Sequence, residues 1–151
     1  MRHAIGQEEM LYQDRDIIQM FKLINKSDKS NRNDTTVRHK SFIENFNIIV
    51  NLIETQGFIN TANLRKKDGE IISRGVTRTL THIFQIQPNL ILNDHFIDLI
   101  TIELNEGRFR QEYLLIPLSV YVYDNKIKIP YNEMLNKAIT KWGIKEQEII
   151  K

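Results

Sequence analysis

Apolar residues recur at helical spacing near both ends of the sequence and follow a different pattern between residues 58 and 129. The clearest helical stripe consists of Phe42, Phe46, Ile49, Val50 and Ile53. Side chains at this spacing lie on one face of an amphipathic helix. Residues 41–44, Ser-Phe-Ile-Glu, have the form of a capping box at the start of this helix, and Gly57 supplies its stop.

An earlier stripe predicts another helix, over residues 8–25. It consists of Met10, Leu11, Ile17, Ile18, Phe21 and Ile24. Acidic residues gather toward its start, where the helix dipole favours negative charge. Residues 25–36 contain no apolar side chain and are rich in turn-forming residues, which predicts an exposed connector. The helical part of the chain is therefore expected to be residues 1–57.

From residue 58 the pattern becomes typical of strands and tight turns. Asp68 and Gly69 lie between strand-like flanks, which is a common mark of a hairpin. In residues 76–86 the apolar positions fit a helix whereas three threonines fit a strand, and we favour the strand. Pro88 and its neighbour then interrupt the pattern.

Two further strands are predicted over residues 96–104 and 109–122, joined around residues 105–108. Pro117 lies inside the second one. Because proline has no backbone N–H to donate, this position is expected at a sheet edge, at a bulge or at a break between two shorter strands. A turn then leads into residues 126–129, which complete a β-rich part spanning residues 58–129.

Helical spacing returns at the C-terminus, where residues 130–143 predict a helix followed by a short tail. Pro130 suits its first turn, and Gly143 suits its end. Its apolar stripe consists of Tyr131, Leu135, Ala138, Ile139 and Trp142. The sequence thus predicts one α+β domain over residues 1–151: two N-terminal helices, an antiparallel β-sheet (meander) and a C-terminal helix packed on the sheet.

Composition excludes several classes of protein. The chain has 151 residues and no cysteine, which excludes disulfides, thiolate metal sites and cysteine nucleophiles. The longest apolar run, residues 114–122, is too short to cross a bilayer, and no signal peptide opens the sequence. We therefore expect a cytoplasmic protein without a membrane partner. The bias toward Ile, Asn and Lys suggests an AT-rich coding sequence, as in many low-GC bacteria, their phages and plasmids, and some parasites. A phage origin would allow a place in the virion.

Basic residues are concentrated in residues 22–78, where 11 of them face six acids, giving a net charge of +5. Such a surface could neutralise the phosphates of a nucleic acid. The candidate contacts are Lys40, Arg65, Lys66, Lys67, Arg74 and Arg78. No aromatic residue lies among residues 65–67 to stack on bases, and no named DNA-binding motif is present. Two solvated loops would explain the same charges.

Three acids, Asp94, Asp98 and Glu103, suggest the carboxylates of a magnesium-dependent nuclease. However, Asn105 stands where that pattern needs a lysine, and on a strand Asp98 and Glu103 would point to opposite faces. The alternative is that they are solvated acids near hairpin ends. No metal ligand is therefore predicted.

Other reactive side chains form no recognisable pattern. The histidines, His3, His39, His82 and His95, lack metal-ligand spacing, although His82 and His95 flank the Pro88 break and could meet in space. Ser73 lacks the glycine-flanked elbow of a nucleophilic serine, and no glycine-rich phosphate loop exists. We predict no catalytic residue and no cofactor.

The run at residues 114–123 would be apolar on both faces of a strand, and a small sheet with one helix layer would leave one face uncovered. The candidate interface residues are Leu114, Ile116, Val120, Tyr121, Val122, Tyr123 and Trp142. The leading hypothesis is a non-enzymatic assembly or interaction protein that contacts other protein subunits, in a homo- or hetero-oligomer. The alternative is a nucleic-acid-binding accessory protein, and the third is a metal-dependent nuclease.

Overall fold

The computed structural model describes residues 12–30 and 35–149, and over these residues it is all-α, without a strand. The seven α-helices are α1 (Asp14–Ser30), α2 (Thr35–Gln56), α3 (Lys66–Ile86), α4 (Asp94–Asn105), α5 (Glu112–Asn125), α6 (Glu133–Trp142) and α7 (Glu146–Ile149). Three single 3-10 turns lie between them: η1 (Thr61–Asn63), η2 (Pro88–Leu90) and η3 (Ile129–Tyr131). The predicted α+β fold with an antiparallel sheet is therefore wrong.

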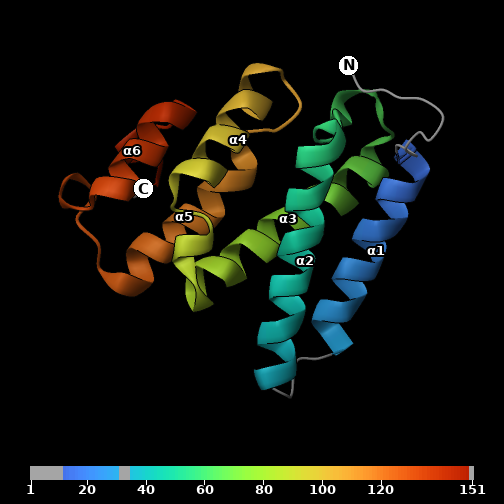
Figure 1. Ribbon diagram of the computed structural model, residues 1–151, viewed down its shortest axis with the longest axis horizontal. Coiled ribbons are helices and arrows are strands. Elements are labelled where there is room, and N and C mark those ends of the chain that lie inside the picture. Colours follow the sequence, from blue (N-terminus) through green and yellow to red (C-terminus); the bar gives the residue numbers. More distant parts are fainter. Residues whose placement is uncertain (1–11, 31–34, 150–151) are drawn as a thin grey trace.

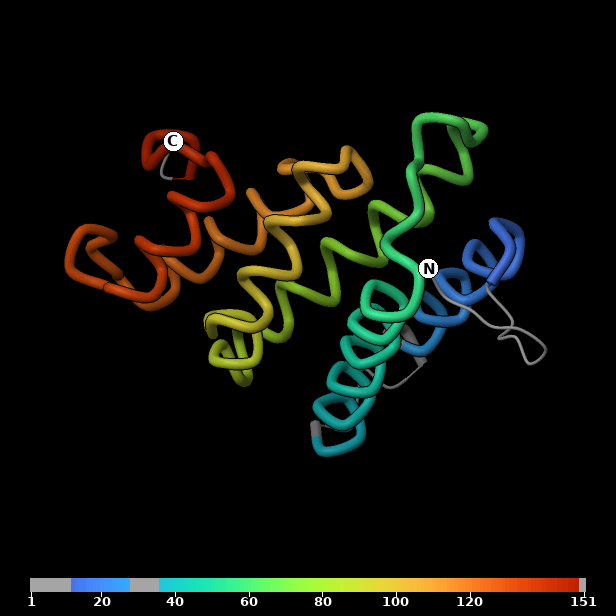
Figure 2. The backbone as a smooth tube through the Cα atoms, turned by 45° about the horizontal axis from the view of Figure 1, so that its top comes forward, coloured from blue at the N-terminus to red at the C-terminus, as the bar shows by residue number. Residues whose placement is uncertain are grey.

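Helix α3 is the centre of the arrangement and packs against α1, α2 and α5. Helices α1 and α2 form an antiparallel pair at one end of the molecule, and α6 lies at the other end (Figures 1 and 2). Helix α4 packs against α6, and α5 packs against α7. Within the described ranges, no helix is long and apolar enough to cross a bilayer.

The predicted hairpin at residues 68–69 and strand at residues 76–86 are wrong because both segments belong to α3. Ile72, Val76, Leu80 and Ile83 are fully buried at helical spacing. Thr81 fits the helix by donating its hydroxyl to the Thr77 carbonyl oxygen at 2.7 Å. The strand preference of threonine is weak and depends on context, so the burial of this helical stripe against α1, α2 and α5 decides the outcome. The predicted interruption at Pro88 is confirmed, since α3 ends at Ile86.

The predicted strands over residues 96–104 and 109–122 are helices α4 and α5 instead. Along α5, Leu114, Leu118 and Val122 are buried at intervals of four residues. Pro117 lies inside this helix and removes one N–H from its ladder, so the predicted edge or bulge is also wrong. The predicted turn at residues 105–108 is confirmed as the link between the two helices.

The exposed connector predicted over residues 25–36 is largely helical, since α1 extends to Ser30 and α2 begins at Thr35. Residues 31–34 lie outside the described residues, as do residues 8–11 of the first predicted helix. Ser41 does not cap α2 but lies inside it, with its hydroxyl 2.6 Å from that of Ser27 on α1. The predicted stop at Gly57 is confirmed: its φ is +83°, and its N–H donates to the Ile53 carbonyl oxygen.

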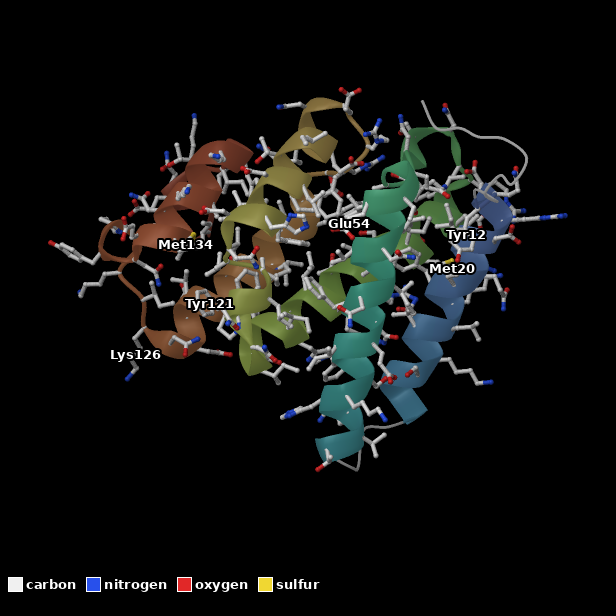
Figure 3. The ribbon with its side chains drawn as sticks, viewed as in Figure 1. Tyr12, Met20, Glu54, Tyr121, Lys126 and Met134 are labelled. Atoms are coloured by element: carbon white, nitrogen blue, oxygen red, sulfur yellow. The ribbon has the colours of Figure 1, made fainter. Side chains whose placement is uncertain are left out.

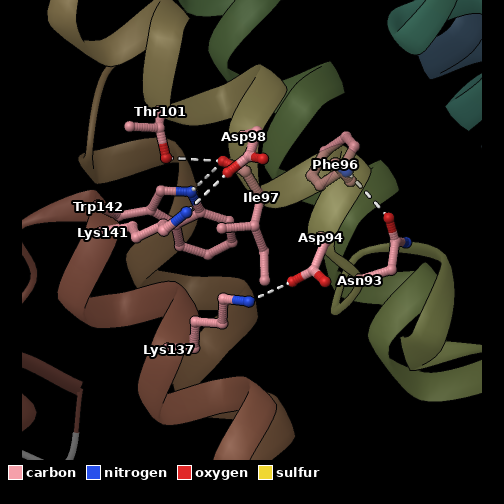
Figure 4. A network of polar contacts seen from close by, with 9 residues as sticks. All are labelled: Asn93, Asp94, Phe96, Ile97, Asp98, Thr101, Lys137, Lys141 and Trp142. Carbon is pink, nitrogen blue, oxygen red and sulfur yellow. Dashed lines mark hydrogen bonds and ion pairs between the residues drawn. The ribbon is translucent and has the colours of Figure 1, made fainter.

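The predicted C-terminal helix is confirmed in its main part, α6. Asn132 caps its start by accepting the Leu135 N–H, and Gly143 ends it with φ of +71°. Tyr131 lies in η3 and is highly exposed, so it does not extend the buried stripe. Trp142 is buried and donates its indole N–H to the Ile97 carbonyl oxygen at 3.2 Å (Figure 4). The helix therefore packs on α4 rather than on a sheet.

Candidate functional site

Asp94 and Asp98 lie one turn apart on α4 and form ion pairs with Lys137 and Lys141 of α6 (Figure 4). The two pairs follow the same order along both helices, so α4 and α6 run parallel. The hydrogen bond and the charge of Lys137 lower the pKa of the Asp94 carboxyl, and Asp94 raises the pKa of Lys137 in turn. Both carboxylates thus form exposed ion pairs that bridge α4 and α6.

Glu103 lies elsewhere on α4 and is only 3% exposed, so it is not the solvated acid that the sequence suggested. Its Oε1 accepts the Phe58 N–H at 2.7 Å and the Arg108 Nε–H at 2.8 Å. Its Oε2 accepts Arg108 Nη2 at 2.9 Å. The three acids of the nuclease hypothesis therefore have separate partners. Among the described residues, no group of three or more metal-ligating side chains is found.

The histidines of the described residues do not form a common site. The His82 ring stacks on the Phe42 ring with 3.9 Å between centroids, and His95 Nε2 lies 2.8 Å from a Glu54 carboxylate oxygen. His39 is exposed on α2, and His3 lies outside the described residues. His82 and His95 therefore have different partners on α2 and do not form the pair that the sequence allowed.

A groove between α1 and α3 brings four basic side chains together. Its volume is about 510 Å³, and it is lined by Lys22, Asn25, Lys26, Ile71, Arg74 and Arg78. Lys22 and Lys26 lie one turn apart on α1, as do Arg74 and Arg78 on α3. None of these lining residues is acidic. We call this feature of the described chain the basic groove.

Gly75 explains how α1 and α3 approach closely enough to form the basic groove. Phe21 of α1 is fully buried against it, and a Cβ atom at position 75 would lie 2.5 Å from a Phe21 ring carbon. One turn further along α1, the Asn25 side-chain amide donates to the Ile71 carbonyl oxygen at 3.4 Å. These contacts form the junction of the two helices, and the basic side chains flank it.

Only two of the six predicted nucleic-acid contacts lie in the basic groove. Arg74 and Arg78 line the basic groove, whereas residues 65–67 are exposed at the start of α3 and Lys40 is exposed on α2. Arg65 forms an ion pair with Asp68 at 3.1 Å. Lys22 and Lys26 were not among the six candidates, although both belong to the same basic stretch. The spacing of four residues places Lys22 and Lys26 on one face of a helix, which the sequence could show. It could not show that Arg74 and Arg78 lie across the groove from them.

Of the seven predicted interface residues, some pack inside the chain and others lie at its surface. Leu114, Val122 and Trp142 are buried within the chain, and the Tyr121 ring packs on the Phe84 ring of α3 with 4.9 Å between centroids. Three remain at the surface on one side of α5: Ile116, Val120 and Tyr123. We call these three residues the α5 stripe.

Comparison with known proteins adds no assignment to this geometry. No protein-family model matches the sequence, and neither a curated protein nor a solved structure matches it significantly.

Proposed function

We propose that this chain binds the phosphate backbone of a nucleic acid in the basic groove. The observation that carries the proposal is the convergence of Lys22, Lys26, Arg74 and Arg78 on one groove, of which the described lining residues include no acid. Lysine and arginine side chains neutralise phosphates and release their counterions, which supplies most of the affinity of non-specific nucleic-acid binding. Four such groups on two facing helices could contact several successive phosphates.

The composition of the groove also indicates how selective the binding is. Contacts to bases require polar groups that reach the base edges or aromatic rings on which bases stack. Among the described lining residues of the basic groove none is aromatic, and Asn25 is the one uncharged polar side chain. We therefore expect binding that depends little on base sequence. Such a partner would be met in the cytoplasm, or in the virion if the chain is of phage origin.

The hypothesis of an assembly protein loses its original basis, because residues 114–123 form a helix rather than a two-sided strand. Four of its seven candidate residues are covered by the chain itself, as described above. A nuclease is not proposed either, since Asp94, Asp98 and Glu103 are engaged in separate ion pairs.

The test is a charge reversal on both walls of the basic groove, Lys22→Glu with Arg74→Glu. We expect the affinity for a labelled single-stranded oligonucleotide, followed by fluorescence anisotropy, to fall at least about ten-fold. Two lost phosphate contacts should also reduce the slope of log K against log salt by about 1.4 on this single strand.

Lys66→Glu with Lys67→Glu is the matched control. It changes the net charge by the same amount, and both residues are exposed on α3 outside the groove. The control should retain most of the affinity. An equal loss in both variants would show that net charge, and not the groove, determines binding, and binding that salt does not weaken would contradict the proposal outright.

A further inference from the structure

Helix α5 exposes an apolar face that none of the residues in 12–30 and 35–149 covers. Ile116 is 59% exposed and Tyr123 is 63% exposed, while Val120 between them is half-buried. Their spacing of four and three residues places them on one face of the helix. The other side of α5 is buried, since Leu114 and Leu118 are fully enclosed. The α5 stripe is therefore a continuous surface about two turns long.

Charged residues of opposite sign lie at the two ends of this stripe. Glu112 lies one turn before Ile116 on the same face. Its side chain is 64% exposed, and its Oε1 lies 3.9 Å from Nη1 of Arg110. Lys126 ends the helix in the left-handed conformation and is exposed. Figure 3 shows the Lys126 side chain extending away from the end of α5. Along this face the order is thus acid, apolar centre, base, because the exposed Asp124 of the last turn lies about 100° round the helix from Tyr123.

We propose that a second copy of this chain packs its own α5 antiparallel against the α5 stripe. In a two-fold dimer each surface meets itself in the reverse order, so a surface that is acidic at one end and basic at the other is self-complementary. Val120 then lies near the axis, Ile116 meets Tyr123 of the partner subunit, and Glu112 lies within reach of Lys126 of the partner subunit. A parallel pairing would place Glu112 against its own copy.

The pairing is compatible with nucleic-acid binding but does not depend on it. Helix α5 contributes no residue to the lining of the basic groove, so the dimer would leave the groove uncovered. A dimer would carry two such grooves. One short helix on each side buries less than the roughly 800 Å² per partner of a standard stable complex, so we expect a reversible association at micromolar concentration.

Sedimentation equilibrium of the whole chain, without nucleic acid, tests the pairing. The wild type should show a monomer–dimer equilibrium, and Ile116→Glu should raise its dissociation constant at least about ten-fold. Ile102→Glu is the matched control, because Ile102 is 54% exposed on α4 and lies outside the stripe. This control should dimerise like the wild type.

Two charge variants and a pair of cysteine variants test the orientation. Glu112→Lys should weaken the dimer, and adding Lys126→Glu should restore it.

Because the sequence has no cysteine, a single Val120→Cys should form a disulfide-linked dimer under oxidation, whereas Ile102→Cys should not. A wild type that stays monomeric at high micromolar concentration, or a dimer that Ile116→Glu leaves intact, would overturn the proposal. Neither result would affect the test of the basic groove, which concerns other residues.

Discussion

Replacing Glu103 with alanine should lower the free energy of unfolding by about 3 kcal/mol. The carboxylate is buried and accepts the Phe58 N–H and two N–H groups of Arg108. Its hydrogen bond with Arg108 raises the pKa of the guanidinium, which is the sign of a favourable pair. Alanine would leave the Phe58 N–H buried without an acceptor and Arg108 without its bidentate partner. Urea denaturation gives the loss directly.

Glu106→Ala is the control for this prediction, because Glu106 approaches the same Arg108 at 3.8 Å but is exposed. It should change stability by less than about 0.5 kcal/mol. Glu103→Gln should fall in between, since the amide oxygen can still accept the Phe58 N–H but carries no charge. Equal effects of Glu103→Ala and Glu106→Ala would show that burial of the carboxylate contributes nothing.

The sequence predicted the helices at the two ends because each buries a single face. Residues 42–53 and 135–142 therefore keep a clear stripe of apolar positions between polar ones. The helix ends at Gly57 and Gly143 could also be predicted from the sequence, since these glycines adopt the positive φ that other residues avoid. These features depend only on neighbours in the sequence.

The middle of the chain was misread for reasons that differ between α5 and α3. Helix α5 packs against both α3 and α7 and also carries the exposed Ile116 and Tyr123, so residues 113–123 are apolar almost throughout and show no helical period. A short apolar run of this kind cannot be told from a buried strand by periodicity. In α3, Asp68 and Gly69 resemble a hairpin turn, but the apolar spacing that follows them is helical.

The basic groove could be predicted only in part for a different reason. Charge counting identified the stretch that contains all four basic residues, but Lys22 and Arg74 are separated by about fifty positions in the sequence. They meet because Phe21 packs against Gly75, which is a tertiary contact. No local pattern shows that contact, so the sequence alone could not separate the groove from the exposed cluster at residues 65–67.

Gly75→Ala should destabilise the protein by about 1–3 kcal/mol, although the same change usually stabilises a helix. Gly75 is buried in α3, and the new methyl group would lie 2.5 Å from a carbon of the enclosed Phe21 ring. The ring, and α1 with it, must move. Gly69→Ala in the same helix is the control: its nearest neighbour would be 3.9 Å away, so we expect a gain of about 0.5–1 kcal/mol. Thermal or urea denaturation compares the two.

The same substitution links the packing of α1 on α3 to the basic groove. If Gly75→Ala pushes α1 outward, Lys22 and Lys26 move away from Arg74 and Arg78, and oligonucleotide affinity should fall even where the protein is still folded. Phe21→Leu combined with Gly75→Ala removes the crowded ring carbon, so it should restore part of both the stability and the affinity. A Gly75→Ala variant as stable as Gly69→Ala would show that α1 does not depend on this close approach. Unchanged affinity in a destabilised variant would show that the groove tolerates a shift of its α1 wall.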